Sequence, residues 1–101
     1  MLRHLSQFNL KYSEGDPEYE GLLDAMYKRA CELPEAKEVK IYRQIDPSNP
    51  FDYCIEVTFP GDDLETLEKY MENPIHDAFC EEVWYKYVKN QLNLNILSLF
   101  E

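Results

Sequence analysis

The chain has little glycine, few basic residues and no long apolar run, and each shortage excludes a class of function. Only 3 of its 101 residues are glycine, and they are scattered, so no glycine-rich loop can cradle a phosphate group. Lysine and arginine number 10 against 20 aspartates and glutamates, for a net charge of -10. Nucleic acids and anionic membranes need clustered cations, so we exclude both as partners. No stretch approaches the ~18 apolar residues of a membrane span.

Cysteine and histidine are also scarce. Cys31, Cys54 and Cys80 form an odd set without Cys-X-X-Cys spacing, each within an otherwise apolar pattern. We therefore expect buried, reduced thiols and a cytoplasmic protein. The chain starts in an alternating segment and not in a long apolar run, which favours the same unexported location. Two histidines with no ligand pair spaced on one element predict no metal site, and no cofactor is expected.

The residues that are present predict one folded unit. Hydrophobic residues make up 45% of the chain and aromatic residues 14%, far above the composition of disordered proteins. A chain of this length buries roughly two-thirds of its unfolded surface. We expect a single domain spanning residues 1–101, with one compact core.

Hydrophobic periodicity predicts the secondary structure. Apolar residues alternate in four segments, which we predict to be strands: residues 2–10, 39–44, 51–59 and 91–100. His4 lies on the more apolar face of the first. Spacings of three and four predict a helix from Pro17, capped by Asp16, to about Leu33, and a second helical region from Leu64. That region should end before Pro74, where Asn73 caps a further helix to about residue 89.

This order of elements predicts an α+β fold, a βαββαβ protomer with a four-stranded antiparallel sheet and its helices on one face. The other face of the sheet is then uncovered. It carries a mixed set of side chains, namely Leu5, Gln7, Asn9, Cys54, Glu56 and Thr58. Such a face is too mixed for a core but apolar enough to favour a partner. We expect a homodimer through this open sheet face, with a water-exposed sheet as the alternative.

Three short motifs, in order along the chain, resemble the stress-responsive dimeric α/β-barrel (Dabb) family. They are Arg3-His4, Ile55-Glu56-Val57-Thr58-Phe59, and Tyr70 followed by Asn73-Pro74-Ile75-His76 and Phe79. The resemblance covers nearly the whole chain. It implies a ferredoxin-like protomer, two of which pack sheet against sheet as a dimeric α/β barrel.

The resemblance also implies a site. A plant polyketide cyclase of this family uses a tyrosine and a histidine in a cavity between sheet and helices, and Tyr70 and His76 match those motif positions. His4 matches a pocket histidine in the first strand. A further pocket histidine, in the third strand, is replaced here by Tyr53. With Phe79 at the same helix junction, we take Tyr70 and His76 as candidate catalytic residues and His4, Tyr53 and Phe79 as candidate ligand-binding residues.

Several functions remain open. Histidine exchanges protons near neutral pH, so His76 can act as a base next to a carbonyl group while Tyr70 holds the developing enolate oxygen. That is a cofactor-free polyketide cyclase or isomerase, and it is the alternative to a first hypothesis, a stress-responsive module that holds a small apolar ligand between sheet and helices. A third hypothesis is an interaction subunit whose acidic surface meets a basic partner. A structural role for His76 and Tyr70 is as well supported by the sequence as a ligand cavity. Cys80, one turn after His76, fits a buried thiol better than a nucleophile.

Overall fold

A four-stranded antiparallel sheet forms one layer of the protein. The computed structural model describes residues 1–100, and the strands are β1 (Leu2–Leu10), β2 (Glu38–Arg43), β3 (Tyr53–Thr58) and β4 (Val88–Leu97). Their order in the sheet is β2-β3-β1-β4, with β1 between its two antiparallel neighbours. The sheet and its antiparallel pairing confirm the prediction.

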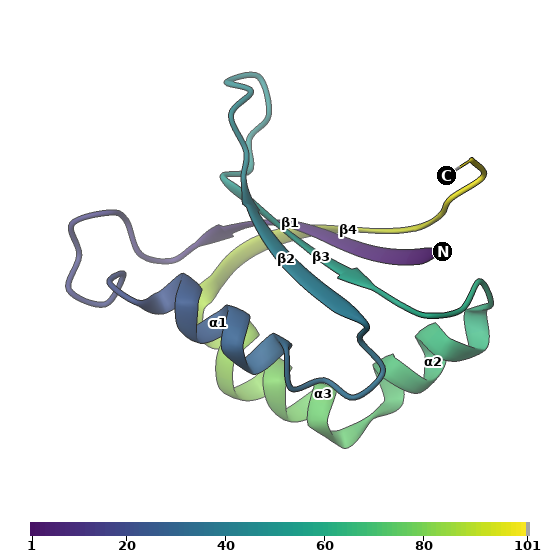
Figure 1. Cartoon of the computed structure of the whole chain (residues 1–101). Helices are drawn as coiled ribbons and strands as arrows, with labels where there is room; N and C mark the ends of the chain where they lie inside the picture. The colour runs from purple at the N-terminus through teal and green to yellow at the C-terminus, as the bar shows by residue number, and fades with distance from the viewer. Residues whose placement is uncertain (101) are drawn as a thin grey trace.

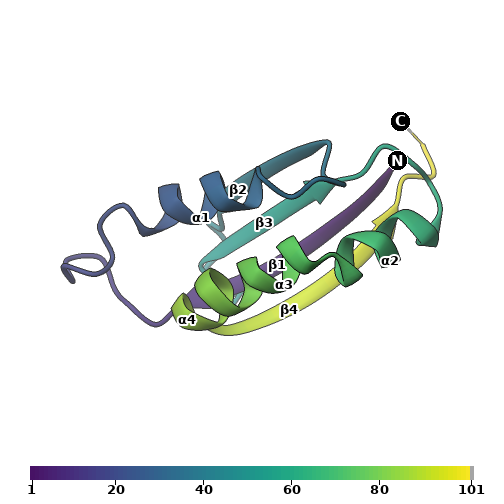
Figure 2. The ribbon, with the colours of Figure 1, turned by 90° about the horizontal axis from the view of Figure 1, so that it is seen from below.

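Helices form the second layer and cover one face of the sheet (Figures 1 and 2). They are α1 (Leu22–Ala30), α2 (Leu64–Glu72), α3 (Pro74–Phe79), the π-helical turn η1 (Cys80–Trp84) and α4 (Tyr85–Tyr87). Between the layers lies a core built from alternate residues of the strands, and Phe8, Val57 and Phe59 are among its most buried members. The element order is the predicted βαββαβ, with the second helical region divided into several pieces.

The first helix begins later than predicted. Pro17 lies in a series of turns, and α1 starts only at Leu22, after Gly21 with a φ of 76°. A left-handed residue ends the preceding turn, and glycine adopts that conformation without steric cost. Asp16, predicted to cap the helix, instead accepts a hydrogen bond at 2.8 Å from the backbone amide of Ser13. The aspartate therefore closes a local turn.

The break between α2 and α3 is as predicted. Asn73 ends α2 with an extended backbone and caps α3, because its Oδ1 accepts a hydrogen bond at 2.8 Å from the backbone amide of Ile75. Pro74 occupies the first turn of α3, where its missing N–H costs nothing. The Nδ2 of Asn73 also donates to the carboxylate of Glu35, 3.2 and 3.3 Å from its two oxygens. One side chain thus joins the helix break to the loop before β2.

Replacing Asn73 with alanine is expected to lower the free energy of unfolding by about 1 kcal/mol, because a lost helix cap typically costs that much. Urea unfolding at a fixed protein concentration measures the change. Asn73→Ser is the matched control, since serine keeps the cap but cannot reach Glu35. If the alanine variant unfolds at the wild-type urea concentration, the cap does not stabilise the break.

The last helix and strand differ from the prediction in their boundaries. The helix ends at Tyr87, and β4 runs from Val88 to Leu97, where the sequence indicated residues 91–100. Hydrogen bonds of the π-helical kind in η1 widen the helix by one residue. Along these helices Leu64, Met71 and Ile75 are 66%, 44% and 49% exposed, whereas Tyr70 and Phe79 are buried.

The face of the sheet away from the helices is open (Figure 1). The pairing of β1 with β3 places Leu5 beside Glu56 and Gln7 beside Cys54, so the predicted residues do share this face. β4 adds an apolar row that the prediction did not include: Leu92, Leu94 and Ile96. They are 56%, 55% and 38% exposed.

The three cysteines are free thiols, but the prediction that all are buried is wrong for Cys31. Cys31 caps the C-terminus of α1 and is exposed, while Cys54 and Cys80 are half-buried. No helix in residues 1–100 is both long enough and apolar enough to cross a bilayer.

Candidate functional site

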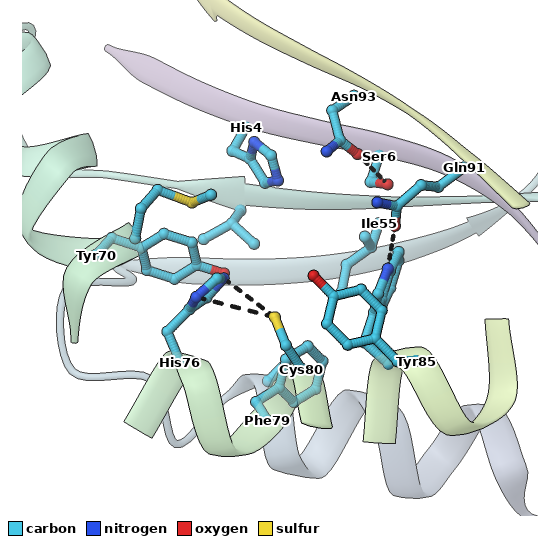
Figure 3. Close-up of a pocket in the computed structure, with 14 residues that line it drawn as sticks. His4, Ser6, Ile55, Tyr70, His76, Phe79, Cys80, Tyr85, Gln91 and Asn93 are labelled. Atoms are coloured by element: carbon cyan, nitrogen blue, oxygen red, sulfur yellow. Dashed lines mark hydrogen bonds between the residues drawn. The ribbon is translucent and has the colours of Figure 1, made fainter. Parts of the chain in front are cut away.

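A cavity of about 80 Å³ lies between the sheet and α2, α3 and η1 (Figure 3). Its lining is His4, Ser6, Ala30, Ile55, Val57, Tyr70, Met71, His76, Phe79, Cys80, Trp84, Tyr85, Gln91 and Asn93. The buried members form an apolar floor, whereas Met71, Tyr85, Gln91 and Asn93 are exposed and form the mouth. An apolar cavity of about 150 Å³ is known to admit benzene, so this smaller cavity can enclose one part of a compact molecule while the rest lies at the mouth.

Tyr70 enters the cavity from the last turn of α2. Its side chain is 3% exposed and packs edge-on against Phe59, with ring centroids 5.0 Å apart. The hydroxyl forms no hydrogen bond with another described residue. Within residues 1–100 every fully buried side-chain oxygen has a hydrogen-bond partner, so the Tyr70 hydroxyl is not fully buried. The hydroxyl therefore faces the space of the cavity. Burial raises the pKa of Tyr70, and the nearby Cys80 and Glu35 add to that rise, so the phenol stays protonated as a donor.

His76 lies on the first turn of α3, directly after the capped break. Its ring centroid is 4.5 Å from that of Tyr70, and Figure 3 shows the Tyr70 hydroxyl on the side of the imidazole. Burial lowers the pKa of His76, the nearby Asp77 opposes that shift, and repulsion from His4 adds to it. The imidazole is therefore neutral and basic at neutral pH.

His4 enters from β1, on the opposite wall. Its Nδ1 is 2.6 Å from the Oδ1 of Asn95 on β4, and its ring centroid is 6.3 Å from that of Tyr70. The amide oxygen is an acceptor, so Nδ1 of His4 donates in this hydrogen bond. The structure thus places His4, Tyr70 and His76 around one cavity.

Two further polar residues from β4 line the cavity, and the sequence analysis missed them. Gln91 accepts a hydrogen bond from Nε1 of Trp84, and Asn93 accepts one at 2.7 Å from the hydroxyl of Ser6. The alternation of asparagine with leucine in this strand was visible in the sequence. It did not reveal that the polar face of the strand points toward the helices.

The two other candidate residues fall in different places. Phe79 is 5% exposed and belongs to the floor of the cavity. Tyr53 does not line the cavity: it stacks on Phe8, and its hydroxyl is 2.6 Å from that of Tyr19. Burial, followed by the hydrogen bond to Tyr19, raises the pKa of Tyr53 to about 12. Tyr53 therefore packs the core at the other end of β3.

Cys80 lies one turn after His76, with its Sγ 3.7 Å from Nε2 and 3.9 Å from Nδ1 of the imidazole. Burial raises the pKa of the Cys80 thiol, and the carboxylates of Asp77 and Glu81 raise it further. Because the thiolate is the nucleophile, this environment favours an unreactive thiol. Within residues 1–100 no three histidine, cysteine or acidic side chains gather as ligands for a metal ion.

This arrangement has the parts for proton transfer at carbon. A neutral imidazole can take a proton from the carbon next to a carbonyl group. A buried phenol beside it can donate a hydrogen bond to the oxygen on which negative charge develops. The apolar floor lowers the local polarity, which strengthens both interactions.

Comparison with known proteins assigns the chain to a family. The family model described as a stress responsive A/B barrel domain matches residues 2–93. No protein with a curated description is matched.

Solved structures share the fold. A protein of the Dabb family from Mesorhizobium loti, described as having a ferredoxin-like fold, is 23% identical over 98% of this chain and 97% of its own, with a TM-score of 0.85. The hydroxynitrile lyase of Passiflora edulis is 20% identical over 96% and 92%, with a TM-score of 0.74. A dimeric ferredoxin-like protein from Thermobifida fusca is 16% identical over 96% and 90%, with a TM-score of 0.67. At these identities the likeness establishes the ferredoxin-like fold.

Proposed function

The chain belongs to the stress responsive A/B barrel domain (Dabb) family, and from its cavity we propose that it binds a small carbonyl compound and catalyses proton transfer next to the carbonyl group. No cofactor takes part. One observation carries the proposal: the Tyr70 hydroxyl bonds to no other described residue and faces the cavity beside the neutral imidazole of His76. A ligand oxygen in the cavity would give the Tyr70 hydroxyl the hydrogen-bond partner that the described residues do not supply.

His76 is the base in this reaction. A ring nitrogen of His76 removes a proton from the carbon next to the carbonyl, and the electron pair of the C–H bond moves into the carbonyl to form an enolate. Tyr70 donates a hydrogen bond to the enolate oxygen. The imidazolium then returns the proton to carbon, which completes an isomerisation. If the enolate instead attacks a second carbonyl in the same ligand, the product is a ring.

The ligand of this proposal is small and largely apolar. The floor offers Ile55, Val57 and Phe79, while the polar groups lie around the mouth and beside the helix break. A compact ketone would bury its alkyl part against the floor and direct its oxygen toward Tyr70. This combines the apolar and carbonyl ligands expected from the sequence in one molecule.

The proposal includes a homodimer in the cytoplasm. The dimeric Thermobifida fusca protein shares the fold, and the open face of the sheet carries the exposed row Leu92, Leu94 and Ile96. Burying such a row against a second copy is the simplest way to remove it from water. The free thiols Cys31, Cys54 and Cys80 favour a reducing compartment.

Deuterium exchange into pentan-2-one tests the reaction, because each proton transfer replaces hydrogen next to the carbonyl in heavy water. Proton NMR follows the loss of those signals with and without protein. We expect Tyr70→Phe to slow the catalysed exchange about 100-fold, since removing one hydrogen-bond donor to a developing oxyanion typically costs that much.

Tyr12→Phe is the matched control, because Tyr12 packs against Tyr87 outside the cavity. It should exchange pentan-2-one at the wild-type rate. Binding of the ketone without exchange would contradict catalysis and identify a module that only holds its ligand. A Tyr70→Phe rate equal to that of wild type would remove Tyr70 from the reaction.

A further inference from the structure

The two faces of β4 are reversed relative to those of its neighbours. On β1 and β3 most apolar side chains point toward the helices, but on β4 Leu92, Leu94 and Ile96 point away and Gln91, Asn93 and Asn95 point toward them. Edge strands often carry polar residues on an exposed side. Here the amides of Gln91 and Asn93 line a cavity and bond to buried groups, so exposure alone does not explain them.

The amide of Gln91 has a fixed direction. Its Oε1 accepts a hydrogen bond from Nε1 of Trp84, a side chain that is 6% exposed and packs edge-on against Phe8. The indole N–H is a donor only, so the oxygen end of the amide must face it. The NH₂ end of Gln91 therefore points away from Trp84.

Asn93 is held in the same way by Ser6. The serine is 2% exposed, and its hydroxyl donates to Oδ1 of Asn93 at 2.7 Å. Figure 3 shows the amide nitrogens of Gln91 and Asn93 on the side where His4 and Tyr70 lie. Within residues 1–100 neither NH₂ group donates to a protein acceptor. The strand thus presents two oriented donors at the mouth of the cavity.

We propose that Gln91 and Asn93 form a donor pair that selects a compact, uncharged ligand with two oxygen acceptors. This inference rests on the proposed function and adds the requirement for a second oxygen. The two residues are next neighbours on one face of the strand, with Cα atoms about 7 Å apart. One oxygen of the ligand faces Tyr70 and His76, where the proton is transferred, and the donor pair holds the other.

Charge favours a neutral ligand over a carboxylate. The chain carries a net charge of -10, and Asp77 lies beside His76. The lining includes no lysine or arginine, and the lowered pKa of His76 leaves its imidazole neutral at neutral pH, so the described cavity offers hydrogen bonds and little positive charge to balance an anion. Pentane-2,4-dione has the required features, since it is neutral, compact and carries two oxygens around an acidic carbon.

Binding of pentane-2,4-dione and of pentan-2-one, measured by chemical-shift titration, tests the donor pair. The wild-type protein should bind the dione more tightly than the ketone. Gln91→Glu keeps an oxygen for Trp84 but replaces the NH₂ donor with a charged acceptor. We expect it to weaken dione binding about tenfold or more and to change ketone binding little. Asn93→Asp makes the same change at the second position and should have the same effect.

Leu64→Asp is the matched control. It adds the same charge at an exposed position at the start of α2, which lies neither in the cavity lining nor on the open face of the sheet, and should leave both affinities unchanged. Trp84→Phe keeps an aromatic ring at this position and removes the N–H group that directs Gln91. It should reduce the preference for the dione while Gln91 remains in place.

The outcomes separate this inference from the proposed function. If the wild-type protein exchanges and binds pentan-2-one but the Gln91 and Asn93 variants keep full affinity for the dione, the donor pair is overturned and the proposed function stands. If the wild-type protein binds neither compound, the proposed function fails and the donor pair fails with it. Tighter binding of pyruvate than of the dione would overturn the choice of an uncharged ligand.

Discussion

Replacing His76 with glutamine is expected to lower the catalysed exchange of pentan-2-one by about 10²–10⁴-fold, the usual contribution of a general base. Glutamine is similar in size and remains polar, but it cannot accept a proton at neutral pH. Because His76 is half-buried and bonds only weakly to Cys80, the fold should tolerate the change. Exchange rates from proton NMR, compared with the thermal unfolding midpoint of each variant, separate lost chemistry from lost structure.

The pH dependence of the wild-type exchange rate should report the titration of His76. Burial lowers the pKa of His76 from its usual value near 6.5, and only the neutral imidazole can take a proton. The rate should therefore be constant at neutral pH and fall as the pH decreases through the lowered pKa. The midpoint should lie below 6.5.

Asp77→Asn is a sharper control, because the carboxylate of Asp77 raises the pKa of His76. Removing that charge should move the midpoint of the pH profile to a still lower pH and leave the rate at neutral pH nearly unchanged. Loss of exchange in His4→Gln together with full exchange in His76→Gln would contradict the assignment and make His4 the base.

Leu94→Asp is expected to weaken the homodimer by about 100-fold or more. Leu94 pairs with Leu5 on the open face of the sheet and is 55% exposed in the single chain. In a symmetric dimer the substitution places two carboxylates in the interface, and burying each unpaired charge costs several kcal/mol. Sedimentation velocity at micromolar concentration measures the loss as a shift from dimer to monomer.

Leu64→Asp is the matched control, since Leu64 is 66% exposed and lies at the start of α2, on the helical side. This variant should sediment like the wild type. The cysteines give a second measurement: Cys54 lies on the open face and Cys31 is exposed on α1. Alkylation of Cys54 should become faster in Leu94→Asp, while Cys31 reacts as before. A wild-type protein that sediments as a monomer would overturn the barrel.

The fold could be read largely from local patterns in the sequence. Alternation in residues 51–59 identified β3, and Asn73-Pro74 identified the helix break because the capping bond and the restricted φ of proline depend only on neighbouring residues. The start of α1 was missed for the opposite reason. Whether Asp16 caps a helix or closes a turn is settled by Gly15 and Gly21, both with positive φ.

The site was predicted less completely than the fold. Tyr70, His76 and His4 came from the family motif, and the structure places all three around one cavity. Tyr53 does not line the cavity. Matching a motif position does not decide which way a longer side chain turns, and the hydroxyl of Tyr53 forms a hydrogen bond with that of Tyr19. Gln91 and Asn93 were missed because alternation shows that a strand has two faces but not which one points inward.

The π-helical turn η1 sets the angular phase of the helix beyond it. In an α-helix each residue advances the chain by about 100°, so one extra residue turns everything that follows by that angle. Tyr85 reaches the mouth of the cavity, and Val88 meets Leu10 at the start of β4, only with that turn included. Deleting one residue from Cys80–Trp84 would move Tyr85 off the mouth and shift the pairing of β4. The number of residues in this helix is therefore constrained, because a change in length moves Tyr85 and β4, and single substitutions do not test this. Family members with a different number of residues here should differ in the ligands they bind.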